Sequence, residues 1–452
     1  MDLKKNLLKV FTANFIALIV GIVNGFFLPA FLSIDQYAYL KTFTLYISYV
    51  GIFHFGFLDG LYLKYGGKYK DNLDRKELKY EHNFFILFQL MVTFLFLILA
   101  YLRKDLIMLA FALSIVPINM QTYFSFLYQS LGEMGTFAKI KTAYPITILC
   151  LNLSFIFLLK IDHYLPFVLA ILIAHYLVYS IFEISYNKDF KINGIKKIQL
   201  KPLFLSGFFI MMGNLSNMFF YSIDRWYVKF LLPLENFSYY SFAVSMMGII
   251  LMMINSISMT FYPNFSRGYE VEQIKKIKIY LIIIGAISSI GYFILSLIVT
   301  NFIGNYVPSL QVISILFVGF PAIGVINALY VNLFKVNKQE RRYFYKVLKM
   351  LIISIILNTL AVLINLSNFS IAIATTIAFY FWFFSSSKDF TGLETNIKEI
   401  AFIFLYIPLF LFSSIFLNYI TGFVLFTLGV FVLVWLFYKK EFKELVDKLI
   451  KR

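Results

Sequence analysis

The sequence predicts an all-α integral membrane protein with about 14 transmembrane helices. Of its 452 residues, 61% are hydrophobic and only 14% are charged, a balance outside the range of soluble domains. Apolar stretches of the roughly 20 residues needed to cross a bilayer core recur from one end of the chain to the other. The loops between them are short, so the membrane is the solvent for most of the chain.

Run length places fourteen candidate spans. The first six cover residues 11–32, 43–63, 84–102, 106–127, 143–159 and 165–184. The next six cover residues 203–223, 237–262, 279–298, 312–334, 347–366 and 369–384, and a last pair covers 400–417 and 422–438. The first stretch is too long for the core of a cleaved signal peptide, and no small-residue cleavage site follows it. We therefore expect it to remain as the first helix.

The distribution of Lys and Arg predicts the orientation of these spans. Of the 40 basic residues, 34 fall on the side of the amino terminus and 6 on the opposite side. Cationic loops are retained in the cytoplasm, so both termini are expected there, in a multi-pass protein of the bacterial inner membrane. The six basic residues expected on the outer side are Lys41, Arg103, Lys104, Lys160, Arg225 and Lys229.

The same distribution argues against several other functions. The net charge of +17 comes from short clusters between spans, with no basic arm or nucleic-acid module, so no nucleic-acid partner is expected. The single cysteine and the four scattered histidines give no metal-ligand spacing, so neither a metal nor another cofactor is expected. No loop is long enough for a catalytic domain, and no P-loop lysine motif occurs. We therefore do not expect an enzyme.

An internal repeat links the two halves of the chain. Residues 32–39 (LSIDQYAY) align with residues 232–239 (LPLENFSY), with two identical and five similar positions at an offset of 200 residues. Each segment joins an outward-going span to an inward-going one, which predicts parallel repeats related by an axis along the membrane normal. Chance similarity between two polar connectors is the alternative.

Polar residues inside spans are costly in hydrocarbon and therefore mark candidate cavity positions. In the first two spans these are Asn14, Asn24, Asp59 and, at a helix end, Lys64. Asn14 and Asn24 lie ten residues apart, on roughly one face of a helix. Hydrogen bonds between helices are the alternative for the two asparagines, and a solvated helix end is the alternative for Asp59.

The seventh span supplies the second group of candidates. Asn214 and Asn217 are neighbours on one helix face, and Asp224 next to Arg225 follows at the outer end. Orientation of the Arg225 guanidinium by the neighbouring Asp224 carboxylate is one interpretation of this pair. Different partners for the two side chains is the other, because helix neighbours one residue apart do not face each other. An anchor in the aromatic belt of the membrane interface is the alternative to a cavity role for the pair. The remaining cavity candidates are Lys41, Lys229 and Asn255.

Several of these segments together resemble one family. They are Asp224-Arg225 with the downstream connector, residues 56–61 (GFLDGL), residues 65–68 (YGGK) and residues 262–267 (YPNFSR). With the fourteen-span layout, they resemble the polysaccharide flippases of the multidrug/oligosaccharidyl-lipid/polysaccharide exporter superfamily. The chain departs from the family pattern at Ala38 and Ser238, where a glycine is common.

The resemblance implies two six-helix lobes, residues 1–201 and 202–390, around a central cavity, followed by a terminal helix pair and tail over residues 391–452. It implies a flippase that moves undecaprenyl-diphosphate-linked oligosaccharide across the inner membrane for O-antigen or capsule synthesis by alternating access. The bilayer, a coupling cation (H+ or Na+) and other polysaccharide assembly proteins are the candidate partners. The alternatives are a cation-coupled multidrug exporter of the same superfamily and a membrane-embedded transferase of polyprenyl-linked glycans.

Overall fold

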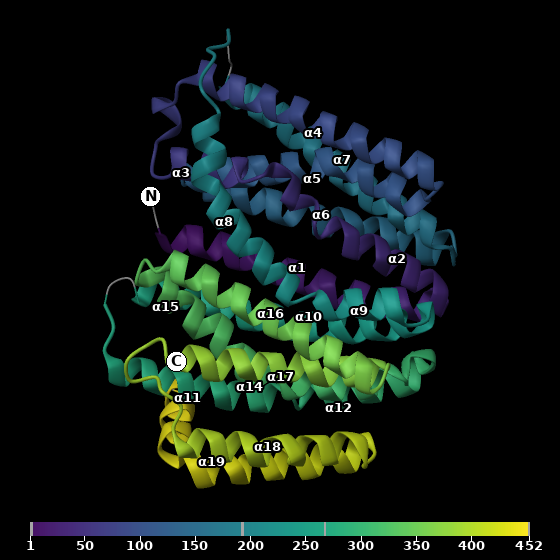
Figure 1. Ribbon diagram of the computed structural model, residues 1–452, viewed down its shortest axis with the longest axis vertical. Helices are drawn as coiled ribbons and strands as arrows, with labels where there is room; N and C mark the ends of the chain where they lie inside the picture. The colour runs from purple at the N-terminus through teal and green to yellow at the C-terminus, as the bar shows by residue number, and fades with distance from the viewer. Residues whose placement is uncertain (1–2, 191–193, 266–267, 451–452) are drawn as a thin grey trace. The chain divides into compact units, whose positions relative to one another are not determined.

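The computed structural model spans residues 1–452 and describes the backbone of residues 3–190, 194–265 and 268–450. The side chains of residues 1–8, 10, 255–257, 259, 260, 262–264, 445, 446 and 448–450 also lie outside the description. Contacts divide the chain into two compact units, Met1–Leu215 and Ser216–Arg452. Helices make up both units (Figure 1).

Among the described residues, eight α-helices begin in the first unit. They are α1 (Leu3–Phe31), α2 (Ile34–Ile47), α3 (Phe57–Tyr65), α4 (Arg75–Arg103), α5 (Leu106–Ser130), α6 (Met134–Leu153), α7 (Tyr164–Phe190) and α8 (Lys201–Phe220). Within this unit α5 packs against α4, α6 and α7, and α1 packs against α6. Aspartates cap two of these helices, since the carboxylates of Asp74 and Asp105 accept hydrogen bonds from the first backbone N–H groups of α4 and α5.

The second unit contains the remaining helices. They are α9 (Ile223–Leu231), α10 (Leu234–Phe265), α11 (Val271–Ser288), α12 (Gly291–Phe302), α13 (Ser309–Val318), α14 (Phe320–Val325), α15 (Val331–Val336), α16 (Glu340–Ile364), α17 (Asn368–Ser387), α18 (Ile397–Ile415) and α19 (Tyr419–Ile450). α18 and α19 run side by side (Figure 1). The Lys278 ammonium of α11 lies 2.6 Å from the buried Glu399 carboxylate of α18 and donates to the Leu393 carbonyl at 2.8 Å. This buried pair fixes the start of the last helix pair.

The expectation of an all-α membrane protein with about 14 spans is confirmed. By length and composition, 12 helices among the described residues are able to cross a membrane, and a bent pair, residues 309–318 and 320–336, raises the number to 13. Helix covers each of the fourteen predicted positions. Three of them are interrupted: the second is broken into separate short helices, the ninth has a turn at Ser289–Ile290 between α11 and α12, and the tenth bends by 49° near Gly319.

The break in the second predicted span follows from its glycines. α2 ends at Ile47, a 3-10 turn covers Val50–His54, and α3 begins at Phe57. Between them Phe55 and Gly56 adopt positive φ angles of 48° and 84°, which interrupt the helix. A Cβ atom at Gly56 or Gly60 would overlap the backbone of α8, and one at Gly207 would overlap the backbone of α3. Hydropathy places a single span here, because the polar residues His54 and Asp59 are isolated among apolar ones.

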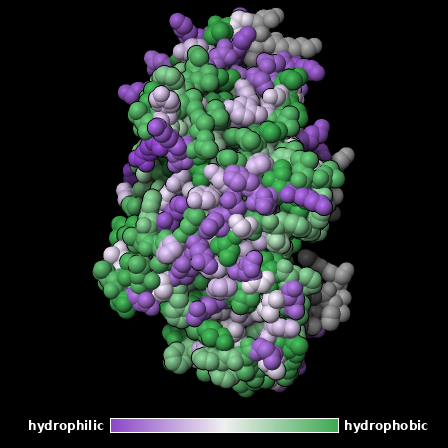
Figure 2. Space-filling model, turned by 90° about the vertical axis from the view of Figure 1, so that its right-hand side faces the viewer, coloured by the Kyte–Doolittle hydropathy of each residue, from purple (hydrophilic) through white to green (hydrophobic). Residues whose placement is uncertain are grey.

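The surface of α4 shows how the helices face lipid. Its large exposed side chains recur every three or four residues and include Leu87, Met91, Phe94 and Ile98. Gln89, on the opposite face, is fully buried, and its amide donates to the Phe53 carbonyl of the 3-10 turn at 3.0 Å. Hydrophobic side chains also cover broad areas of the face shown in Figure 2. This pattern is apolar outside and polar inside, as expected for helices in a bilayer.

Candidate functional site

The polar residues of the first unit gather at the break and along α3. Asp59 lies in the first turn of α3 and is 5% exposed. Its Oδ2 atom is 3.8 Å from Nε2 of His54, another buried residue at the end of the 3-10 turn. The structure therefore places Asp59 inside the unit next to a histidine, and not at a solvated helix end.

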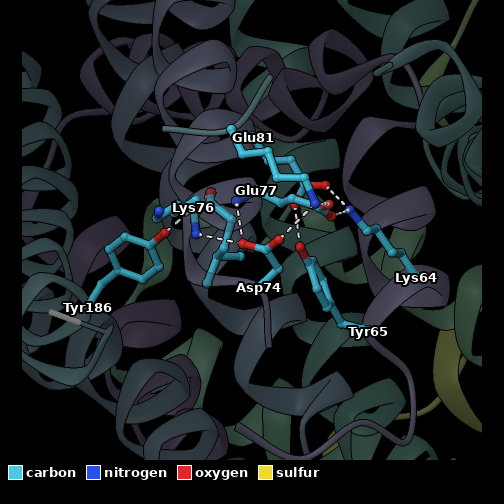
Figure 3. A network of polar contacts seen from close by, with 9 residues as sticks. Lys64, Tyr65, Asp74, Lys76, Glu77, Glu81 and Tyr186 are labelled. Atoms are coloured by element: carbon cyan, nitrogen blue, oxygen red, sulfur yellow. Dashed lines mark hydrogen bonds and ion pairs between the residues drawn. The ribbon is translucent and has the colours of Figure 1, made fainter. Parts of the chain in front are cut away.

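A charged cluster surrounds the other end of α3 (Figure 3). The Lys64 ammonium lies 2.5 Å from the Glu81 carboxylate and 3.3 Å from that of Glu77, both on α4. The Tyr65 hydroxyl donates to the second oxygen of Glu81 at 2.7 Å, and Glu81 is fully buried. A buried carboxylate requires such partners, because an unpaired charge is costly away from water. Two carboxylates thus offset the charge of Lys64 in this conformation.

Lys196 extends the cluster toward the loops. Its ammonium lies 2.7 Å from Glu77 and 3.0 Å from Asp74. The hydrogen bond from Lys196 lowers the pKa of the Asp74 carboxyl, and hydrogen bonding to Glu77 and then Asp74 raises the pKa of Lys196. Both groups are exposed, so water weakens this pair. Of this network, only Lys64 is a candidate from the sequence. The spacing of Glu77 and Glu81, four residues apart at the start of a helix, is the signal that indicates the rest.

In the second unit the polar site forms around Asp224. This residue, in the first turn of the short helix α9, is 3% exposed. Its Oδ2 accepts hydrogen bonds from the Tyr240 hydroxyl of α10 at 2.8 Å and the Thr375 hydroxyl of α17 at 3.4 Å. Its Oδ1 accepts from the backbone N–H of Arg225 at 2.7 Å. Asp224 therefore joins three helices of the unit.

The first interpretation, contact between the Asp224 carboxylate and the Arg225 guanidinium, is not what the structure shows. Within the described residues no ion pair joins these two side chains. Helix neighbours one residue apart point in different directions, which explains the separation. Asp224 fixes the backbone of Arg225, whereas the guanidinium is half-buried, and its Nε has no hydrogen-bond partner in the part of the chain that the structure describes.

The other predicted residues have mixed surroundings. The Asn24 carbonyl oxygen accepts a hydrogen bond from the Asn152 amide at 3.0 Å, which links α1 to α6. Lys41 and Lys229 each place their ammonium over an aromatic ring, at 5.0 Å and 5.2 Å from the centroids of Tyr37 and Phe237. The remaining candidates are Asn14 on α1 and Asn217 on α8, both half-buried, Asn214 on α8, which is exposed, and Asn255, whose side chain lies outside the described residues.

These features define a class, the polytopic all-α membrane proteins with ionisable side chains buried among their helices. No protein-family model matches the chain, and no curated protein sequence matches it. Among solved structures, the fold is similar to that of "Lipid II flippase MurJ, inward closed conformation", with a TM-score of 0.70. The sequences are 17% identical, and the match covers 95% of this chain and 98% of that one. At this identity the likeness establishes the fold.

Proposed function

We propose that the protein is a flippase that moves a lipid-linked oligosaccharide across the cytoplasmic membrane. The observation that carries the proposal is the match of nearly the whole chain to the fold of a lipid II flippase. The match also supports the sequence resemblance at the level of the exporter superfamily. Parallel repeats that alternate access to a site near the bilayer midplane would provide the mechanism.

We propose Arg225 as a contact for the diphosphate group of this substrate. A diphosphate requires cationic or amide donors, and a guanidinium offers several in a planar arrangement. Asp224, bonded to Tyr240 and Thr375, fixes the backbone that carries Arg225. Lys64 is a weaker candidate, since Glu77 and Glu81 already neutralise it.

Replacing Arg225 tests this contact. Arg225→Lys keeps the charge but loses the planar donors, and Arg225→Ala loses both. Glycan export should fall in the order wild type, Lys, Ala, with a loss of about ten- to hundredfold for Ala, the effect of losing one or two hydrogen bonds to a charged group. Arg103→Ala is the matched control, because Arg103 is an exposed arginine expected on the same side. Equal export by the Arg225→Ala protein at equal membrane levels would refute the role.

The proposed cargo is an undecaprenyl-diphosphate-linked oligosaccharide for O-antigen or capsule synthesis. A strain that lacks the protein should accumulate this intermediate on the cytoplasmic leaflet, measurable by mass spectrometry of extracted lipids and by protection from an external glycan-binding probe. Restoring the gene should release the block. Normal export without accumulation would overturn the proposed function.

Lipid II is the second candidate cargo, favoured by the name of the structural neighbour. The two cargoes share the diphosphate and differ in the glycan. Expression of this chain in cells depleted of their lipid II flippase separates them: rescue of growth would assign lipid II, and failure to rescue at normal membrane levels would favour the oligosaccharide.

A further inference from the structure

The break between α2 and α3 contains a histidine with an unusual set of neighbours. The backbone N–H of Gly56 donates to Nδ1 of His54 at 3.1 Å. An acceptor nitrogen carries no proton, so this hydrogen bond assigns the ring proton to Nε2. Nε2 faces Oδ2 of Asp59 at 3.8 Å, which is too long for a hydrogen bond.

Asp59 has an unused acceptor at this position. Its Oδ2 is buried and accepts no hydrogen bond from any described residue. The same unit contains a closed counterpart, His82 and Glu183, whose Nε2 and Oε2 atoms are 3.0 Å apart. The comparison shows that the fold can bring a histidine and a carboxylate into hydrogen-bond contact, and that it holds the first pair apart.

We propose that His54 is a proton-binding site whose occupancy sets the geometry of the joint between α3 and α8. A proton that binds Nδ1 from water removes the lone pair that accepts the Gly56 N–H. The resulting imidazolium attracts Asp59, and a charge-assisted bond of roughly 2.8 Å can then form between Nε2–H and Oδ2. Proton binding thus exchanges a bond to the backbone for a bond to a side chain.

This exchange of hydrogen bonds takes place where α3 packs closely against α8. Gly56 and Gly60 contact the backbone of α8 at Gly207 with no room for a Cβ atom. The backbone at Phe55 and Gly56 has positive φ angles, a conformation that the Gly56 hydrogen bond helps to hold. α8 continues from the first compact unit into the second, because it covers Lys201–Phe220 and the units divide after Leu215. A change at Gly56 therefore acts directly on the helix that connects the units.

The other acidic and basic groups around the break are paired or exposed. Asp59 is the only one that the structure pairs with His54 among the described residues. On the packed helices α4 and α5 the buried ionisable side chains are Glu81, His82, Tyr123 and Tyr128, of which Glu81 pairs with Lys64 and His82 with Glu183. On α8, Lys201 at the first residue is exposed. The proton response of the joint therefore belongs to His54 and Asp59.

This inference rests on the proposed function, since a proton-controlled joint is a means of biasing the conformational cycle of a flippase. Its test uses purified full-length protein without substrate. The chain has four histidines, so 15N-histidine labelling gives few signals. His54, identified by its loss in His54→Asn, should change from a neutral to an imidazolium signal as the pH is lowered. Over the same range, amide exchange of the peptide covering residues 54–60, corrected for intrinsic rates, should rise about tenfold, as expected for one lost hydrogen bond.

Three variants distinguish the effect of proton binding from an effect of the substitution on the fold. In His54→Asn the new side chain can still accept the Gly56 N–H but takes up no proton, so exchange should become independent of pH. Asp59→Asn should abolish the imidazolium signal over that range. His175→Asn is the control, because His175 is a buried histidine of the same unit bonded to the amide of Gln121, and it should leave the His54 titration unchanged.

A neutral His54 at every pH at which the protein stays folded, or the same pH-dependent exchange in His54→Asn, would overturn the inference. These measurements need no glycan, so they stand apart from the export assay. If export fails the test while His54 titrates, the proposed function falls and the switch remains. If export behaves as expected and His54 does not titrate, the proposed function stands and the switch is refuted.

Discussion

The two connectors that repeat in the sequence, residues 32–39 and 232–239, have the same local structure and different partners. In each, a helix ends, two residues follow, and the next helix starts at the equivalent position, Ile34 or Leu234. A buried aromatic ring stands at the third residue after each start, Tyr37 or Phe237, with a lysine over it. The lysines are not equivalent, since Lys41 follows its ring in the chain and Lys229 precedes it.

Each connector also contacts the start of the sixth predicted span of its own unit. In the first unit the Gln36 side chain accepts the backbone N–H of Tyr164 at 2.9 Å. In the second unit the backbone carbonyl of Asn236 accepts from the Asn368 side chain at 3.0 Å. In the first unit a side chain accepts from a backbone N–H, and in the second unit a side chain donates to a backbone carbonyl. The contact therefore lies at the same place in both units, but different groups make it.

Charged groups differ more strongly between the units. The first unit buries Glu81 against Lys64 and a tyrosine, next to a broken helix. The second buries Asp224 against hydroxyl groups and a backbone N–H, and it places its lysine–glutamate pair at the terminal helices. The two units therefore share the position of their connectors and differ in the charged groups that they bury.

The side of the membrane on which each connector lies tests whether the two connectors belong to parallel repeats. Parallel repeats place both connectors on one side, so cysteines introduced at Asp35 and Glu235, in a Cys150→Ala background, should both react with an impermeant reagent from outside. Cysteines at Lys70, Lys196 and Lys338 should react only from the cytoplasm, as the 34 to 6 division of basic residues predicts. Connectors on opposite sides would mean inverted repeats and would contradict the prediction of parallel repeats.

The largest effect on stability is expected at the buried pair of the second unit. Glu399→Gln removes the only carboxylate that the described residues place within ion-pair distance of the Lys278 ammonium, which is 2% exposed and keeps neutral partners, the Leu393 carbonyl and the Phe383 ring among them. Removing one member of such a pair costs about 3–5 kcal/mol, which should appear as a lower free energy of unfolding in lipid bilayers. Adding Lys278→Met removes the stranded charge and should recover most of the loss. A double variant as unstable as Glu399→Gln alone would contradict this account.

A smaller loss is expected for the corresponding change in the first unit. In Glu81→Gln the Lys64 ammonium keeps Glu77 as a partner, and the Tyr65 hydroxyl can still donate to the new amide oxygen. We expect about 1–2 kcal/mol, in the range of a lost hydrogen bond to a charged group. Glu77→Gln, at an outer position of the same cluster, is the matched control and should cost less. A loss equal to that of Glu399→Gln would show that Glu77 does not compensate.

The sequence could predict the spans but not their interruptions. Apolar run length places a helix at all fourteen positions, because the bilayer imposes one length scale on every span. At the break, Gly56 lies against the backbone of α8 at Gly207, about 150 residues further along the chain. No local pattern contains that information.

The candidate site was predictable to a similar degree. Intramembrane polarity singled out Asp59, Lys64 and Asp224, all of which lie in polar clusters. Their partners could not be read from the sequence, since Tyr240 and Thr375 are ordinary residues of apolar spans until the fold brings them to one carboxylate. Of the two interpretations of Asp224 and Arg225 that the sequence leaves open, the structure favours different partners, because the Asp224 carboxylate is bonded to Tyr240 and Thr375.

The smallest and most discriminating effect concerns the exchanged roles at the two connectors. Gln36→Ala and Asn368→Ala should each lower the free energy of unfolding by about 1 kcal/mol, the worth of one hydrogen bond.

The acidic isosteres then distinguish the two contacts. Gln36→Glu keeps an acceptor for the Tyr164 N–H and should retain the bond, whereas Asn368→Asp loses the side-chain donor to the Asn236 carbonyl and should behave like Asn368→Ala. Both new carboxylates lie in the first turn of a helix and gain the same favourable dipole term, so that term cancels in the comparison. Equal responses to the two acidic substitutions would mean that the connectors are held by packing alone.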